Sequence, residues 1–358
     1  MIRIIIPLLC FVAFFGSPET ATAQNWLTRE ACDFGAIKAE DVDFQKALSQ
    51  KLASNSSDGP VNGVGKLWKV RHPNETTSYI WGSFHASDKL YIDQAAVLLD
   101  VIAKVDAAIF EHTFRSMKRK DLARFNSRDR WSNSITASHW LQKLHPSVKK
   151  AVVNRFKFWN IDEGDLAYLQ ASAAVDYLLA SPCEDFNRGA YPTQDNYIQM
   201  LADHQRLKIV GLEVPDALSK RNYGFWNNKI SISIINVFGA YLVDPKIESR
   251  EIAVAERVQG ELYRLGEIGI MMQLDQEYVR GVLGEEEGAR HLKVSDGYLL
   301  DERNENWIKR LIPALKQQSN LIVVGAFHLP GETGLIESLR REGMLVSRIA
   351  LPEEEPSR

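Results

Sequence analysis

The tetrapeptides Gly82-Ser83-Phe84-His85 and Gly325-Ala326-Phe327-His328 decide the fold of this chain, because they repeat one short pattern at two distant places. Each copy closes a run with the composition of a buried strand, Ser78-Tyr79-Ile80-Trp81 before the first and Leu321-Ile322-Val323-Val324 before the second. Each histidine is therefore expected where a strand leaves its sheet. Open α/β sheets bind their ligands at such strand ends.

Both copies continue in the same way, with a polar loop, an amphipathic helical stretch and another apolar strand. The chain therefore predicts an α+β fold in which two related β-loop-helix-β units build one mixed sheet. A hairpin over residues 66–82 is expected to feed the first motif. Two further buried strands are expected to end on Glu111 and Glu213.

The rest of the chain falls into segments of different composition. Residues 1–23 resemble a signal peptide, 24–63 a leader and linker, 64–350 the folded domain, and 351–358 a frayed tail. Within the domain, residues of about 115–200 carry mainly helical patterns. They predict a helical insertion that caps the sheet.

The N-terminus predicts export. Arg3 supplies a positive charge, an apolar stretch over residues 4–15 is too short to span a bilayer comfortably, and Ala21-Thr22-Ala23 fits a cleavage site. A periplasmic or secreted protein without a stable membrane span is therefore expected after cleavage, and an uncleaved anchor is the alternative.

Two cysteines, Cys32 and Cys183, remain after cleavage in a compartment that favours oxidation. A disulfide between them is the expected state. Nucleophilic cysteine chemistry is the alternative, but neither cysteine has an obvious base beside it in the sequence.

Charge limits the partners. The formal net charge is −3, and acidic and basic residues are interspersed, so nucleic acid is not expected as a partner. A peptide or another small-molecule substrate fits better. The sequence carries no signal for an oligomeric state.

Four strand ends thus carry His85, Glu111, Glu213 and His328. Imidazoles and carboxylates together are typical ligands of Mn²⁺, Co²⁺ or Zn²⁺, and they are also the groups of a general acid/base centre. A single histidine after a strand is more often a hydrogen-bonding loop residue, but the repeated context favours a shared site. Gly82 and Gly325 would let a neighbouring backbone or a ligand approach, or they mark simple bulges.

The chain resembles the TraB/PrgY/GumN family, which includes the TIKI metalloproteases, over roughly residues 64–350. The resemblance rests on the two Gly-x-x-His motifs, Ile109-Phe110-Glu111, Val210-Gly211-Leu212-Glu213, Asp301-Glu302-Arg303-Asn304 and Val324-Gly325-Ala326-Phe327-His328-Leu329-Pro330-Gly331. It implies one active centre formed by both histidine motifs and the strand-end glutamate. In the TIKI branch it further implies metal-dependent hydrolysis of peptide bonds.

Transferred to matching positions, the resemblance makes His85 and His328 metal ligands or catalytic groups and Glu111 a ligand or base. Glu213 occupies the matching third strand end. Arg303 and Asn304 match a pair that precedes a helix, where a guanidinium could hold a carboxylate or stabilise an oxyanion. A structural salt bridge or a helix cap is the alternative for Arg303.

These observations lead to the hypothesis of a secreted or periplasmic metal-dependent hydrolase with peptide bonds as its target. Glu111, Glu213 and Arg303 would be catalytic, and a divalent metal would be the cofactor. A metal-free esterase with a histidine base is one alternative. A non-catalytic periplasmic protein that binds or regulates is the other.

Overall fold

A computed structural model describes residues 37–53, 59–73, 76–86, 88–113, 139–157, 161–178, 192–213, 228–243 and 249–354. The predicted signal peptide, Cys32 and Cys183 lie outside these residues. Export and the disulfide therefore stay predictions. Within the described residues, no helix combines the length and the apolar character needed to cross a membrane.

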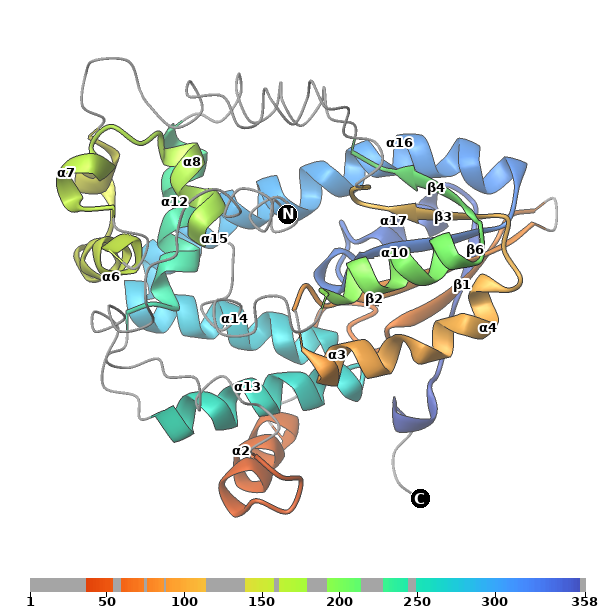
Figure 1. Ribbon diagram of the computed structural model, residues 1–358, viewed down its shortest axis with the longest axis horizontal. Coiled ribbons are helices and arrows are strands. Elements are labelled where there is room, and N and C mark those ends of the chain that lie inside the picture. Colours follow the sequence, from red (N-terminus) through yellow and green to blue (C-terminus); the bar gives the residue numbers. More distant parts are fainter. Residues whose placement is uncertain are drawn as a thin grey trace.

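One mixed sheet forms the centre of the fold, as the sequence predicts (Figure 1). Its six strands run in the order β4-β3-β5-β2-β1-β6. The strands are β1 (Leu67–Arg71), β2 (Thr77–Ser83), β3 (Ala107–Phe110), β4 (Lys208–Gly211), β5 (Asn320–Gly325) and β6 (Leu345–Ile349). The pairs β2–β5, β5–β3 and β3–β4 are parallel, whereas β1 is antiparallel to both of its neighbours.

The crossover from β4 to β5 brings the two motifs together. Strand β5 enters the sheet between β2 and β3, and Ser83 pairs with Gly325 in register. Since β2, β3, β4 and β5 are parallel, their carboxyl ends share one edge. The strand ends that the sequence singles out are therefore neighbours.

Helices cover both faces of the sheet. Along β5, Leu321 and Val323 face one layer, whereas Ile322 and Val324 face the other. The helices are α2 (Val42–Ala53), α3 (Lys89–Gln94), η3 (Ala95–Leu98), α4 (Leu99–Ile102), η6 (Trp140–Lys143), α6 (Pro146–Lys157), α7 (Glu163–Leu166), α8 (Ala171–Leu178), α10 (Gln194–His204), α12 (Asn228–Ala240), α13 (Ser249–Arg264), α14 (Ile268–Leu283), α15 (Glu285–Asp296), η7 (Gly297–Asp301), α16 (Glu302–Gln317), η8 (Ala326–His328), α17 (Leu335–Arg341) and η9 (Pro352–Glu354).

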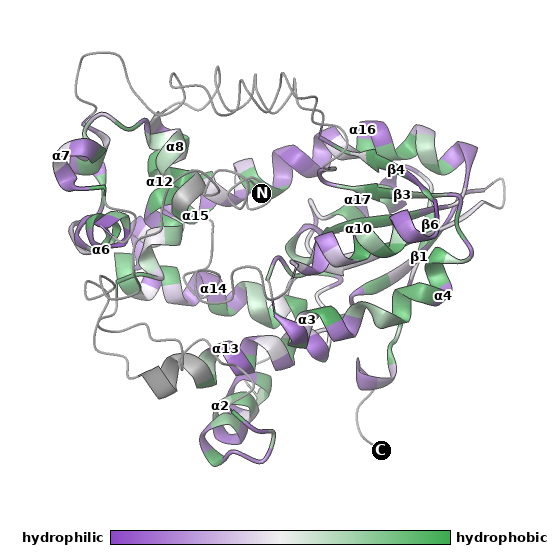
Figure 2. Ribbon diagram, viewed as in Figure 1, coloured by the Kyte–Doolittle hydropathy of each residue, from purple (hydrophilic) through white to green (hydrophobic). Residues whose placement is uncertain are grey.

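The two layers have different helices. Residues of α16 and α17 pack on one face, and residues of η3, α4 and α10 pack on the other. Figure 2 shows hydrophobic residues along β3, whereas α13 and α16 alternate between hydrophilic and hydrophobic stretches. This alternation is the pattern of helices that bury only one side.

A helical part lies beside the sheet, and it is larger than the predicted insertion. Helices α6, α7 and α8 come from that region, but their core also takes in residues of α12, α14 and α15 from later in the chain. In Figure 1, α6, α7, α8 and α12 lie together at the left of the view, away from the sheet, and α12 packs against α8, α6 and α15. Helix α10, by contrast, belongs to the sheet layer, where it contacts β3 and β4.

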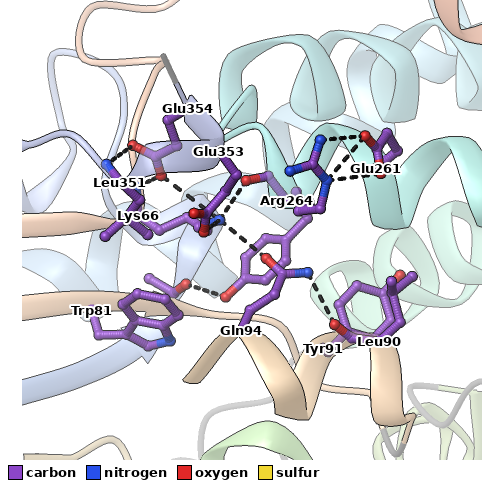
Figure 3. A network of polar contacts seen from close by, with 12 residues as sticks. Lys66, Trp81, Leu90, Tyr91, Gln94, Glu261, Arg264, Leu351, Glu353 and Glu354 are labelled. Atoms are coloured by element: carbon purple, nitrogen blue, oxygen red, sulfur yellow. Dashed lines mark hydrogen bonds and ion pairs between the residues drawn. The ribbon is translucent and has the colours of Figure 1, made fainter. Parts of the chain in front are cut away.

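The C-terminal segment is docked as far as Glu354, which corrects the prediction of a frayed tail. The carboxylate of Glu354 is fully buried, 3.7 Å from Nζ of Lys66, and it also binds Arg348. Lys66 Nζ donates to the carbonyl of Arg264 and to Gln94 (Figure 3). A buried ammonium needs such partners. The acidic composition of residues 351–358 does not indicate that one of these carboxylates would be buried beside a lysine.

Candidate active site

Each motif makes room for the other through its glycine. A methyl group on Gly82 would lie 2.7 Å from Cδ1 of Leu329 and 3.0 Å from Cα of Ala326. A methyl group on Gly325 would lie 2.8 Å from Nε2 of His85. The glycines therefore permit the close approach that the sequence suggested for them.

Glu111 and Glu213 stand side by side because the parallel ladder continues past β3 and β4. The amide of Leu212 donates to the carbonyl of Phe110, and the amide of Glu213 donates to the carbonyl of Glu111. Both side chains are buried. Oε1 of Glu111 also accepts the amide N–H of Gly325 at 2.6 Å, which ties β3 to the second motif.

Arg303 joins these two carboxylates. Its Nη2 donates to Glu111 at 2.8 Å and its Nε to Glu213 at 2.5 Å. Burial alone would lower the pKa of Arg303, but the charges of Glu213 and Glu111 outweigh it and raise that pKa. The guanidinium lies 4.4 Å from the ring centre of Trp307, one turn further along α16.

Arg303 and Asn304 also fix the ring of His328. The side-chain Nδ2 of Asn304 donates to the carbonyls of His328 and Thr333, so its Oδ1 is the acceptor that faces Nδ1 of His328 at 2.8 Å. Nδ1 of His328 therefore carries a proton. Its Nε2 accepts from Nη1 of Arg303 at 3.1 Å.

His85 is oriented by an acid far away in the sequence. Its Nδ1 lies 2.6 Å from Oδ2 of Asp195, in the first turn of α10, and Ser83 donates to the other oxygen of Asp195. Burial would raise the pKa of Asp195, but the charge of His85 and the hydrogen bonds from His85 and Ser83 lower it overall. Asp195 thus stays ionised beside the imidazole.

The residue before Asp195 holds the first motif in place. Oε1 of Gln194 accepts the backbone N–H of Phe84 at 3.0 Å and the hydroxyl of Tyr263 at 2.8 Å. The hydroxyl of Tyr263 is also within hydrogen-bond distance of the carbonyl of Gly82, at 2.7 Å. Successive residues at the start of α10 therefore position the backbone and the histidine of motif one.

Exposure separates His85 from the rest of the cluster. Its side chain is 29% exposed, whereas the side chains of His328, Glu111 and Arg303 are 2%, 4% and 4% exposed. Nε2 of His85 lies 3.7 Å from Oε1 of Glu111, and Nε2 of His328 lies 3.9 Å from the same oxygen. The predicted site residues thus form one cluster, and His85 is its most accessible member among these four.

This arrangement does not fit a resident metal ion. Within the described ranges, no group of three or more His, Cys, Asp or Glu side chains is placed to hold one. Ligands at about 2.1 Å from a tetrahedral ion lie about 3.4 Å apart, closer than the separations from Glu111 to either histidine. In addition, Arg303 engages Glu111, Glu213 and His328.

The structure adds residues that the sequence did not single out. Asp195, Gln194 and Tyr263 position the first motif, and Trp307 packs against the ring of His328 with ring centres 4.4 Å apart. The sequence carried a signal for Trp307 alone among these residues. It lies on a buried stripe of α16 with a spacing of four residues, which runs from Arg303 through Trp307 to Leu311.

Comparison with protein-family models matches residues 66–348 to the TraB/PrgY/gumN family. The chain belongs to this family. The match confirms the resemblance over nearly the whole domain that was predicted, residues 64–350. Comparisons with curated proteins and with solved structures returned no match. For this member of the TraB/PrgY/GumN family, the site therefore has to be interpreted from its own geometry.

Proposed function

We propose that this chain is a hydrolase of esters or amides and that His85 is its general base. The observation that carries the proposal is the contact, 2.6 Å long, between the Asp195 carboxylate and Nδ1 of His85, whose side chain is 29% exposed beside a buried charged cluster. Buried charges are costly, and a fold seldom needs them for stability alone. A carboxylate that orients a histidine is a recurring arrangement in hydrolytic sites.

In the proposed reaction, a water molecule has to reach Nε2 of His85, which is a buried atom of a partly exposed ring. This nitrogen takes a proton from the water while the water oxygen attacks the acyl carbon. The ionised Asp195 stabilises the imidazolium that forms. The carbon–heteroatom bond of the tetrahedral intermediate then breaks, and His85 returns the proton to the leaving alcohol or amine. The balance requires only water and the acyl compound.

Glu111, Arg303 and Glu213 have a positioning role in this proposal. The contacts of the guanidinium are with protein groups, which supports a role in holding the two carboxylates and His328 in place. Glu111 in turn accepts from Gly325, beside His85. The ion-pair cluster therefore supports the backbone and side chains next to the base.

Peptides are the first substrate class to test, because the family resemblance implies hydrolysis of peptide bonds. The proposed place of action is the periplasm or the outside of the cell, and its support is the apolar N-terminal stretch with the Ala21-Thr22-Ala23 site. Simple esters are the second class, because an oriented histidine base acts on both.

The test is a screen of a peptide library and a panel of chromogenic esters, each with and without chelator. Wild type should hydrolyse at least one class, and His85→Ala should lower the rate by about a hundredfold or more. The matched control is His204→Ala, which removes an exposed histidine from the end of α10 and should keep the wild-type rate.

The results of this screen distinguish a histidine-based hydrolase, a metal-dependent hydrolase and a non-catalytic binding protein. Equal rates in wild type and His85→Ala would refute the role of His85. Hydrolysis that disappears with chelator would favour the metal-dependent mechanism. No hydrolysis of either class would count against a hydrolase and favour a protein that binds without catalysis.

A further inference from the structure

We propose that the guanidinium of Arg303 occupies the place of a divalent cation, so that the site of this chain is complete without a resident metal. This occupancy of the site does not depend on whether the site hydrolyses a substrate.

Arg303 contacts the atoms that a metal ion would use as ligands. One nitrogen each goes to Oε2 of Glu111 at 2.8 Å, Oε1 of Glu213 at 2.5 Å and Nε2 of His328 at 3.1 Å. These atoms come from the ends of β3 and β4 and from the second motif. A planar guanidinium with several fixed N–H directions can satisfy such spread-out acceptors at once.

The remaining donor atoms are not gathered around one point. Three atoms at the strand ends lie outside these contacts: Nε2 of His85, Oε1 of Glu111 and Oε2 of Glu213. The first two are 3.7 Å apart, and Oε2 of Glu213 faces Nε2 of His112 at 3.3 Å. Among the described residues, no three such side chains are placed to hold an ion. Catalytic zinc sites use about three protein ligands. An ion drawn to Nε2 of His328 would also meet a permanently charged nitrogen 3.1 Å from that atom.

Charge supports the same assignment. Two buried carboxylates and an imidazole need a compensating cation, and the buried guanidinium of Arg303 already supplies it through its contacts with all three. Removal of the guanidinium would leave Glu111, Glu213 and His328 facing a vacated volume. Such a set of two carboxylates and one imidazole suits Zn²⁺ or Mn²⁺.

The experiment measures bound metal by elemental analysis and thermal unfolding for the full chain grown with added Mn²⁺, Co²⁺ and Zn²⁺. Wild type should carry well below one ion per chain, and chelator should leave its Tm unchanged. Arg303→Ala should bind about one ion per chain, and added metal should raise its Tm by at least about 3 °C. The matched control is Arg340→Ala, which deletes a guanidinium bound to Glu337 but not to histidine, and should gain no metal.

Wild type with about one ion per chain whose removal lowers the Tm would overturn the proposal. So would a folded Arg303→Ala variant that takes up no more metal than Arg340→Ala does. If Arg303→Ala does not fold, the metal content and chelator response of wild type decide alone. None of these readouts needs a substrate, so their failure is distinguishable from a failure of the proposed hydrolase.

Discussion

Gly325 of the second motif lies against His85 of the first, so closely that a methyl group on its α-carbon would stand 2.8 Å from Nε2 of the imidazole. Gly325 ends β5, and His85 follows the neighbouring parallel strand β2, whose last residue Ser83 pairs with Gly325. The glycine of one copy thus sets the space for the histidine of the other. The repeated motif is therefore one structural unit made of two distant segments.

This contact predicts different effects for the two glycines. Gly325→Ala should displace His85 and lower kcat/KM by at least about tenfold, because a small misplacement of a base is costly. Gly82→Ala meets the backbone of Ala326 and should instead lower the free energy of unfolding by about 1–3 kcal/mol. Urea denaturation and initial rates separate the two effects. Equal activity of Gly325→Ala and wild type would contradict the contact.

Asp195 is predicted to act through His85. Asp195→Asn keeps the shape but removes the charge, so kcat/KM should fall by at least about tenfold without loss of fold. Asp203→Asn, an exposed change in the same helix, is the control and should leave the rate unaltered. If both variants have the wild-type rate, Asp195 does not position the base.

The docked C-terminus predicts unequal roles for adjacent glutamates. Glu354→Ala removes a fully buried carboxylate from Lys66 and Arg348 and should lower the free energy of unfolding by about 2–3 kcal/mol. The cost is limited because burial already lowers the pKa of Lys66 to about 8, which eases loss of its proton. Glu353→Ala, at a carboxylate 26% exposed, should cost about 1 kcal/mol or less. Chemical denaturation compares them, and equal losses would refute the assignment.

Asp296 predicts a pH dependence of stability. Burial, with the charges of Asp275 and Asp301, raises its pKa from 3.8 to about 7. Between these values the folded state binds more protons than the unfolded state, so this group makes stability fall as pH rises from about 4 to 7. Asp296→Asn removes that loss and should be more stable than wild type at pH 8 by at least about 1 kcal/mol, but not at pH 4.

The control for this prediction is the exposed Asp100→Asn, which should follow the wild-type profile. Asp275, whose pKa burial raises to about 6, remains in all three proteins. Its charge acts on Asp296, so the difference between Asp296→Asn and wild type reports on the coupled pair. Parallel stability profiles for Asp296→Asn and wild type across this pH range would contradict the assignment.

The repeated motif was enough to predict the mixed sheet and the clustering of its strand ends, because strand, glycine and histidine recur with fixed spacing. Asp195 and Gln194 could not be predicted in the same way. They lie 110 positions from the residues that they hold, His85 and Phe84, at the start of an ordinary amphipathic helix. Only the crossover between β3 and β4 brings that helix to the site.

The partners of the charged residues were only partly predictable from the sequence. Arg303 was expected to hold a carboxylate or to stabilise an oxyanion, and its contacts with two carboxylates and His328 depend on four separate strand ends or helices. Glu354 was expected in a frayed tail because its neighbours are acidic. Its buried partner Lys66 lies 288 positions earlier in the chain. Pairings at such separations leave no local pattern.

The most direct test of the central claim, that His85 is the base of a hydrolytic site, is chemical rescue. The half-buried position of His85 would leave an accessible space in His85→Gly. With a substrate from the screen and with chelator present, added imidazole should restore the rate in proportion to its concentration, and more basic imidazoles should restore it more. A rate that imidazole leaves unchanged, but that Mn²⁺ or Zn²⁺ restores in the absence of chelator, would contradict the account.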